Sequence, residues 1–321
     1  MEIIFNCTKD SIKKAAKALK DGHLVAFPTE TVYGLGADAL NIQAVSRIYQ
    51  IKKRPRSHPL IVHISNTNLL KYWVIEIPDY AQQIAEQFWP GPVTLILKKN
   101  PRMNDFVTGG QSNIGIRIPN NSCALEILRN FEAIGGTGVA APSANMFKSI
   151  SPTNAQDVWK ELGERFTNGD LILDGGNSKI GIESTIIDCT TLYPKILRPG
   201  YVTQIMLENC VNLKLKGFTH KNTINHSGEH LIHYQPKTPL FVNIKPLPGD
   251  GLIALSEIDT PQSVYRLSAP KTLDSFASSL YSSFRQADEM KLARIVVILE
   301  RQDGIAEAIM DRAKKASAKK A

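Results

Sequence analysis

Apolar and polar positions along residues 1–210 alternate with periods that switch repeatedly between those of helices and strands. Ile12, Ala15 and Leu19 follow helical spacing, with Thr8 placed to cap this helix and Gly22 to end it. Further amphipathic segments predict helices over 41–53, 79–88, 121–131 and 154–162. Short apolar runs predict strands over 23–27, 60–64, 93–99, 114–118, 171–174 and 184–188. The pattern therefore predicts a mixed α/β domain that ends near residue 210.

The periodicity is lost between residues 213 and 238, a polar and histidine-rich stretch that we interpret as a linker or lid. Beyond it, short apolar runs precede a helical segment over 271–288, a strand over 294–300 and a final helix, as in a small parallel α/β unit. The sequence thus predicts three parts: a first domain over 1–212, the linker over 213–238 and a smaller, Rossmann-like domain over 239–321.

Composition places the chain among ordinary globular proteins. Apolar residues make up 43% of it and charged residues 21%, and no apolar run is long enough for a membrane span. The N-terminus lacks a basic segment followed by an apolar core, so we expect no secretory signal and a cytoplasmic protein without a membrane partner. The scattered cysteines are expected to be reduced, buried thiols: Cys7, Cys123, Cys189 and Cys210.

Charge adds a weak indication of the partner. The formal net charge of +8 favours anionic partners such as nucleic acid or nucleotides, although part of the excess lies in the tail "RAKKASAKKA". The linker histidines His226, His230 and His233 are spaced too loosely to predict a metal site.

The stretch "FPTETVYGLG" at residues 27–36 poses the first question about chemistry, because Gly34-x-Gly36-x-x-Ala39 loosely matches the dinucleotide fingerprint. Residues 28–33 separate the preceding strand from the first glycine, and Arg54 and Arg56 lie where an acidic residue is expected. A P-loop motif is also absent from the sequence. We therefore reject a dinucleotide site, which leaves either a turn that uses the glycines or a different kind of pocket.

Cations and hydroxyls gather in four further stretches. "KKRPRSHPLIVHI" places a basic loop, stiffened by prolines, before a strand; it suits a polyphosphate, or is a solvated surface loop. Arg117 points opposite to its apolar neighbours in "GIRIP", toward either a ligand or solvent. "SISPTNAQDV" offers hydroxyls that either cap the next helix or meet a phosphate at its N-terminus. "LRPG" fixes Arg198 beside a turn.

Together these stretches resemble one known family. Its motifs occur here in order over about residues 23–200: "FPTETVYGLGADA", "KKRPRSHPLIVHI", "WPGPVTLIL", "GIRIP", "APSAN", "GIESTIID" and "LRPG". The family is that of the YrdC/Sua5 threonylcarbamoyl-AMP synthases, and "HYQP" before a smaller α/β unit resembles the longer Sua5 form. The resemblance implies an α/β fold with a YrdC-like twisted mixed sheet, and makes "FPTETVYGLG" a wall of a threonine pocket.

The resemblance also implies a reaction. L-Threonine, bicarbonate and ATP with Mg²⁺ would give L-threonylcarbamoyl adenylate, pyrophosphate and water, so that the chain is expected to be a nucleotidyltransferase. The product would pass to a downstream threonylcarbamoyl-transferase machinery that makes t6A in tRNA, and weak direct RNA binding is compatible with the basic charge. Attacking carbamate and triphosphate are both anionic, so positioning and charge neutralisation are expected to carry the catalysis.

Site residues follow by the same resemblance. Catalysis is assigned to Lys52 and Arg54, without a strong general base. L-Threonine would be bound by Thr31, His63, Arg117 and Ser184, with Arg117 on the α-carboxylate. ATP would be bound by Arg54, His58, Thr108, Ala141, Ser143, Asn145, Ser151, Arg198, His230 and Tyr234. The segment before "HYQP" is poorer in glycine and proline than this family pattern implies.

Two rival functions are weighed against this one. A basic α/β module that grips RNA without chemistry would share the charge, but no cluster of stacking aromatic residues is visible. A carbamoyl transferase of hydrogenase maturation shares the domain, but would carry zinc-finger and acylphosphatase-like segments, and neither is seen.

Overall fold

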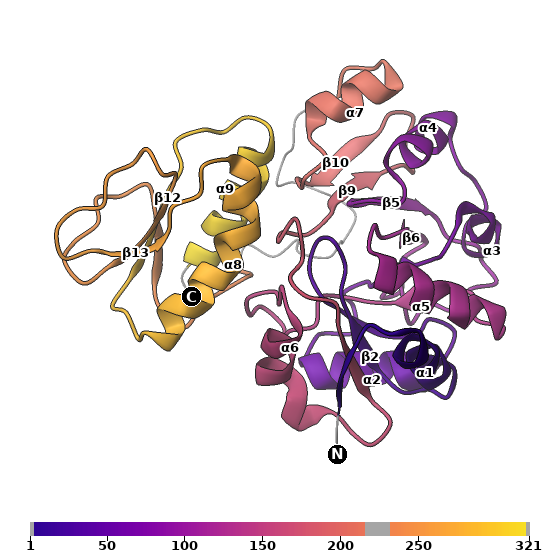
Figure 1. The fold of residues 1–321 in the computed structure, drawn as a ribbon. Helices are drawn as coiled ribbons and strands as arrows, with labels where there is room; N and C mark the ends of the chain where they lie inside the picture. Colours follow the sequence, from indigo (N-terminus) through magenta and orange to yellow (C-terminus); the bar gives the residue numbers. More distant parts are fainter. Residues whose placement is uncertain (1–2, 216–231, 319–321) are drawn as a thin grey trace.

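The structure is a computed structural model that describes residues 3–215 and 232–318. Within these residues the strands form a ten-stranded mixed sheet and a separate four-stranded sheet (Figure 1). The larger sheet has the order β1-β8-β2-β3-β7-β4-β6-β5-β9-β10, and the smaller has the order β11-β14-β12-β13. The predicted α/β class, with a mixed sheet and a smaller parallel unit, is confirmed.

The strands of the larger sheet are β1 Ile4–Asn6, β2 Val25–Phe27, β3 Gly34–Asp38, β4 Ile61–His63, β5 Val93–Lys98, β6 Asn113–Arg117, β7 Val139–Ala140, β8 Leu171–Asp174, β9 Thr185–Asp188 and β10 Lys195–Arg198. Those of the smaller sheet are β11 Leu240–Val242, β12 Gly251–Ala254, β13 Tyr265–Ser268 and β14 Ile295–Ile298. The helices are α1 Lys9–Lys20, α2 Ile42–Lys52, α3 Leu70–Trp73, α4 Asp79–Phe88, α5 Ser122–Ala133, α6 Ala155–Leu162, α7 Gln204–Val211, α8 Leu273–Glu289 and α9 Ile305–Ser317.

Helix α1 shows how the sequence pattern becomes structure. The side chain of Thr8 caps the helix in a capping box with Ser11, as the sequence predicted in part. Its apolar stripe, including Ile12 and Leu19, packs with Phe131 of α5 against Val25 and other residues of one face of the larger sheet. Helices on the opposite face close a second, larger core, so the central strands are buried on both faces.

Strand β3 is one of several short elements that the sequence pattern did not predict, along with β1, β7, β10, α3 and α7. It pairs antiparallel with β2, so that "FPTETVY" is the connection of a hairpin. A Cβ on Gly36 would lie 2.7 Å from the ring of Phe27 and 2.8 Å from Val139, which no side chain tolerates. The glycine thus serves strand packing, which explains its chance likeness to a dinucleotide fingerprint.

The smaller sheet is covered by α8 and α9, which lie between it and the larger domain (Figure 1). All of its strand pairs are parallel, as the alternating pattern predicted. Its core takes in Val32, Ile150 and Ile182 from the larger domain. The two α/β units therefore share one packed interface. The boundaries 1–212, 213–238 and 239–321 stay a prediction, and residues 216–231 lie outside the described part.

Two cysteines form a disulfide that the sequence analysis did not predict. Cys7 and Cys123 are joined by a disulfide with their Cα atoms 5.9 Å apart, whereas all the cysteines were expected to be reduced. The pair lies 116 residues apart in the sequence, and only the packing of α1 against α5 brings the two together. Cys189 and Cys210 are free, and only Cys189 is buried.

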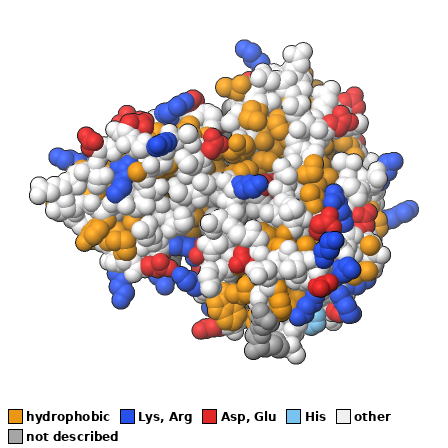
Figure 2. Space-filling view, in the orientation of Figure 1, with side chains coloured by type: hydrophobic (Ala, Val, Ile, Leu, Met, Phe, Trp, Pro, Cys, Tyr) orange, Lys and Arg blue, Asp and Glu red, His pale blue; other side chains and the backbone are white. Residues whose placement is uncertain are grey.

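The surface of the view in Figure 2 carries interspersed cationic and anionic side chains. Apolar side chains gather on the part that carries α7, where Ile205 and Met206 are exposed (Figure 2). Of the helices in the described ranges, none combines the length and the apolar character needed to cross a membrane.

Candidate active site

The candidate site lies where strands of the larger sheet end beside the hairpin connection. The last residues of β4 and β6, His63 and Arg117, are register partners, so their side chains share one end of the sheet. A cavity of about 40 Å³ opens there. It is lined by Thr29, Thr31, Val32, Tyr33, Gly34, Ile61, His63, Arg117, Ala141, Pro142, Ser143, Glu183, Ser184, Arg198, His233 and Tyr234.

The cavity brings together residues that are far apart in the sequence. All four predicted threonine ligands line it: Thr31, His63, Arg117 and Ser184. Of the predicted ATP ligands, it includes Ala141, Ser143, Arg198 and Tyr234. Because nucleotide-sized pockets run to roughly 300–1,000 Å³, a cavity this small cannot hold ATP without movement of its walls.

Arg117 is buried and lies against a carboxylate. Its Nη2 is 2.7 Å from Oε1 of Glu30, and its Nε donates to the carbonyl of Gly91 at 3.2 Å. Both charged side chains are about 5% exposed. The solvent-facing alternative for Arg117 is therefore wrong. Glu30, which is not among the lining residues, holds the guanidinium through Nη2, and this leaves other N–H groups of Arg117 for an anionic ligand in the cavity.

His63 is neutral at the wall of this cavity. Burial and the neighbouring charge of Arg117 lower its pKa from 6.5 to about 3. Its Nδ1 has no hydrogen-bond partner among the described residues, and its ring meets the edge of Phe27. A neutral imidazole with a free nitrogen can exchange a hydrogen bond with a polar ligand without adding charge.

Ser184 and Arg198 form a hydrogen-bonded pair. The carbonyl of Ser184 accepts hydrogen bonds from Nε and Nη2 of Arg198 at 3.0 and 2.9 Å. Nη2 also contacts the hydroxyl of Ser184, which is 2.8 Å from the hydroxyl of Thr94. This chain of contacts fixes both side chains at the start of β9 and the end of β10.

Lys52 sits beside the cavity and holds one of its loops. Its ammonium donates to the carbonyls of Ser143 and Asn145, within the "APSAN" stretch. Burial and the charge of Arg54 lower its pKa well below the ordinary value. The side chain is 2% exposed, so in this structure it organises the loop of Ser143.

Arg54 is buried, contrary to what the sequence predicted. A residue between Lys53 and Pro55 in a basic loop was expected to lie outside the core, but Arg54 is 7% exposed. Its Nη2 donates to the carbonyl of Pro59 at 2.9 Å, and its guanidinium lies over the ring of Phe147. Burial lowers its pKa to about 10, so it remains charged at neutral pH, and its Nε has no hydrogen-bond partner among the described residues.

The remaining predicted ligands lie around the cavity or away from it. The ring of His58 meets Phe147 edge-on. Asn145 donates to the carbonyls of Met146 and Ser149, and Ser151 donates to Glu183. The hydroxyl of Thr108 bonds within its own turn, to the carbonyl of Asp105. These residues are not among those that line the cavity, and His230 lies outside the described residues.

The end of the linker lies against the site. Tyr234 is buried, and its ring stacks on Tyr281 of α8 with centroids 5.7 Å apart. Its neighbour His233 meets Phe147, whose ring also contacts Arg54. Burial and the surrounding cations lower the pKa of His233 well below its ordinary value. The predicted lid function stays a prediction, but the segment contacts both domains: the N–H of His233 donates to the carbonyl of Lys315 in α9, and that of Gln235 donates to the carbonyl of Lys148.

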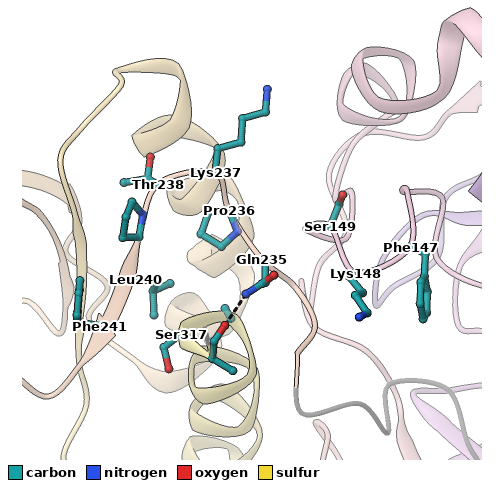
Figure 3. Close-up of a pocket in the computed structure, with 13 residues that line it drawn as sticks. Phe147, Lys148, Ser149, Gln235, Pro236, Lys237, Thr238, Leu240, Phe241 and Ser317 are labelled. Carbon is teal, nitrogen blue, oxygen red and sulfur yellow. Dashed lines mark hydrogen bonds between the residues drawn. The ribbon is translucent and has the colours of Figure 1, made fainter. Parts of the chain in front are cut away.

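A second cavity, of about 640 Å³, lies beside Gln235 and the residues that follow it (Figure 3). Phe147 and Lys148 line it from the larger domain, and residues 235–241 line it from the linker and β11. Gln235 closes one side by donating to the carbonyl of Ala318 at 2.6 Å (Figure 3). Figure 3 shows the ring of Phe147 set at the side of the larger domain.

Sequence reasoning missed several residues at the site. Glu30 and Glu183 lie inside quoted motifs, but a single sequence did not show that they pair with arginines. Arg312 and Tyr281 reach Glu183 from the C-terminal unit. The available signal was Arg312 itself, a charged residue among apolar ones on a helix face that should be buried.

Known proteins resemble this chain over nearly all of its length. Residues 17–200 match the Sua5/YciO/YrdC family model, described as "Telomere recombination", and residues 202–318 match "Threonylcarbamoyl-AMP synthase, C-terminal domain". The threonylcarbamoyl-AMP synthase of Pyrococcus abyssi is 33% identical, with 95% of this chain and 94% of the relative covered. That of Bacillus subtilis is 36% identical, with coverages of 95% and 92%.

The fold agrees with these relatives. The crystal structure of P. abyssi Sua5 complexed with L-threonine superposes with a TM-score of 0.86 at 32% identity. The superposition covers 99% of this chain and 97% of the other. The ordered motifs, the two sheets and the matches over both units agree, and the chain belongs to the Sua5/YrdC family, in its long form with the threonylcarbamoyl-AMP synthase C-terminal domain.

Proposed function

We propose that the cavity described above is the place where this threonylcarbamoyl-AMP synthase binds L-threonine and presents its carbamate to ATP. The observation that carries the proposal is the convergence of Arg117, Ser184 and Arg198 in one buried cavity. The reaction that we assign to the chain joins L-threonine, bicarbonate and ATP into L-threonylcarbamoyl adenylate, the product for which its relatives are named.

L-Threonine would bind through its α-carboxylate to Arg117. Glu30 keeps this guanidinium in place, and the two charges compensate each other before the substrate arrives. Thr31 and Ser184 supply hydroxyls, and neutral His63 supplies a nitrogen. A crystal structure of the P. abyssi relative holds L-threonine, which supports this assignment.

ATP would lie with its phosphates toward the cations that surround the threonine. Arg198 lines the cavity, while the guanidinium of Arg54 lies over the ring of Phe147, outside that lining. Lys52 would act by holding the loop of Ser143, since its ammonium is bound to backbone carbonyls. His58, Thr108, Ala141, Asn145, Ser151, His230 and Tyr234 stay predictions as nucleotide ligands. Because the cavity is too small for ATP, binding requires residues 233–234 to shift.

The chemical step then needs little proton transfer from the protein. The threonine amine and bicarbonate condense to a carbamate and release water. A carbamate oxygen attacks the α-phosphorus of ATP, an O–P bond forms, and the bond to the β-phosphate breaks to release pyrophosphate. Arginines aimed at the anions lower the repulsion between attacker and triphosphate.

Mg²⁺ would enter with ATP as part of the substrate. Among the residues that line the cavity, the single carboxylate is that of Glu183, and it is already paired with Arg312. The lining otherwise offers hydroxyls, carbonyls and cations, which suit an ion that is carried by phosphate oxygens and water. The chain is further proposed to supply its adenylate to a tRNA-modifying transferase in the cytoplasm, with at most weak RNA binding of its own.

The experiment is pyrophosphate release from ATP, measured with each co-substrate left out in turn. We expect release to require both L-threonine and bicarbonate. Arg117→Met should raise the KM for threonine about 10- to 100-fold and change that for ATP little, because a charge-assisted hydrogen bond contributes about 1.5–3 kcal/mol.

Arg129→Met is the matched control, because Arg129 is an exposed arginine paired with Glu126 on α5. Its KM values should equal those of the wild type. Pyrophosphate release that persists without threonine would contradict the function, and a normal KM for threonine in Arg117→Met would contradict the site.

A further inference from the structure

Arg312 is a fully buried arginine of helix α9 that reaches into the larger domain. Its Nε donates to Oε2 of Glu183 at 2.9 Å, and its Nη1 donates to the carbonyl of Pro199 at 2.7 Å. Its Nη2 contacts the carbonyl of Glu183 at 3.3 Å. On its own helix it pairs with Asp311 at 2.9 Å. One guanidinium from the C-terminal unit thus joins two loops that flank the cavity.

Glu183 is the acceptor at the centre of this contact. Besides Arg312, it accepts hydrogen bonds from Ser151 at 2.6 Å and from Tyr281 of α8 at 3.0 Å. Burial alone would raise the pKa of this carboxyl, but the charges of Arg312 and Arg198, together with the hydrogen bonds from Ser151 and Arg312, lower it. Glu183 is therefore a buried carboxylate, and its negative charge is compensated only by the donors that surround it.

The residues next to Glu183 and Pro199 belong to the proposed site. Ser184 follows Glu183, and Arg198 precedes Pro199. A Cβ on Gly200 would lie 2.3 Å from the backbone nitrogen of Thr185, so the turn after Arg198 is packed directly on the start of β9. A displacement of either loop would therefore move Ser184 and Arg198 together.

We propose that Arg312 is a positioning residue for the reaction, which holds Glu183 and the turn at Pro199 so that Arg198 stays bonded to Ser184 and faces the cavity. The proposal rests on the proposed roles of Ser184 and Arg198. Without Arg312, the buried carboxylate of Glu183 loses its main partner, and Arg198 is the other cation whose charge acts on it. Arg198 would turn toward Glu183 and away from the ligand.

A purely structural role for Arg312 makes a different prediction. If it only joined two domains, its loss would lower stability without a selective effect on one substrate. The pair Arg294–Asp250 provides the comparison, since Arg294 donates two hydrogen bonds to Asp250 at 2.9 and 2.6 Å within the C-terminal unit. It lies outside the residues that line the cavity.

The test uses the full-length chain and four variants: Arg312→Met, Glu183→Gln, the double variant of these two, and Arg294→Met as the control. The readouts are the kcat and the KM values of pyrophosphate release, the Kd of MgATP by calorimetry, and the melting temperature. Arg312→Met should raise the Kd and KM for MgATP about tenfold or more. The reason is that the buried charge of Glu183 is left unpaired and draws Arg198 away from the ligand.

The double variant separates positioning from bulk stability. Removal of the charge of Glu183 should restore the MgATP affinity of Arg312→Met to that of Glu183→Gln alone, since no carboxylate remains to attract Arg198. Arg294→Met should lower the melting temperature and leave the KM values unchanged. Normal MgATP affinity in Arg312→Met, or equal losses with and without Glu183→Gln, would overturn the proposal.

Two further variants cover the case in which Arg312→Met does not fold. Arg312→Lys keeps the charge but loses the fork, and Tyr281→Phe removes one donor to Glu183. Both should raise the KM for MgATP by a smaller factor, and unchanged values in both would contradict the proposal. A wild-type chain that binds MgATP but forms no adenylate would refute the proposed function, while the calorimetric comparison would still decide the role of Arg312.

Discussion

Individual arginines carry most of the proposed chemistry, and each is held by a different kind of contact. Arg117 faces a carboxylate, Arg198 a serine, and Arg54 a carbonyl and an aromatic ring. The sequence identified these arginines by their motifs, but it did not predict that Arg54 is buried. A basic, proline-containing loop indicates exposure, and only the packing of Phe147 against it shows otherwise.

Arg54→Ala tests whether this buried arginine contributes to turnover. If Arg54 acts on the phosphates of ATP as we propose, turnover should fall about 100-fold or more, on the order of 3 kcal/mol, because that cation is lost. Arg54→Lys should recover only part of it, since a point charge does not replace the fork. Because Arg54 is buried, Arg54→Ala should also lower the melting temperature.

Arg56→Ala is the control for that measurement, because Arg56 lies two residues away in the same loop and is exposed. Its turnover and melting temperature should match the wild type. Near-normal turnover in Arg54→Ala, at a temperature where the variant is folded, would show that Arg54 has a purely structural role.

Among the elements, those with clear periodicity were predicted well. Helix α1 and strands β5 and β8 lie where the spacing of apolar residues placed them. Strand β3 was missed, because "GLGAD" has neither alternation nor β-branched residues; its pairing with β2 comes from the hairpin. Tertiary contacts decided that element, and local propensity did not.

The segment from His233 to Gln235 is the element whose role most needs a test. Tyr234 has a positive φ of 61° and is fixed by packing on Tyr281 and under Arg312. Tyr234→Ala should weaken MgATP binding about tenfold. The variant loses the aromatic contact with Tyr281 and the cation–π contact with Arg312, about 0.5–2 kcal/mol each, that hold this segment at the cavity.

Tyr234→Phe keeps the ring and should bind MgATP as the wild type does, because the hydroxyl has no hydrogen-bond partner among the described residues. Tyr265→Ala removes an exposed tyrosine of β13 and serves as the control. Calorimetry would decide: equal affinities in Tyr234→Ala and the wild type would show that this segment does not support the nucleotide site.

At the scale of the whole molecule, the site depends on both α/β units. Motif order in the sequence indicated the family, and it named several residues of the larger domain that line the cavity, including Arg117 and Ser184. It gave no indication that α8 and α9 reach the site through Tyr281 and Arg312. These contacts join segments far apart in the sequence, and the local pattern of apolar and polar residues does not show how the two domains pack.

Mass detection of the product would show most directly whether this chain condenses the three substrates. Purified full-length protein would be incubated with MgATP, L-threonine and carbon-13 bicarbonate. We expect an adenylate that contains threonine, carries the label in its carbamoyl group and is absent when any one substrate is omitted. An adenylate without the label, or none formed in a threonine-dependent way, would contradict the claim that this chain condenses the three substrates.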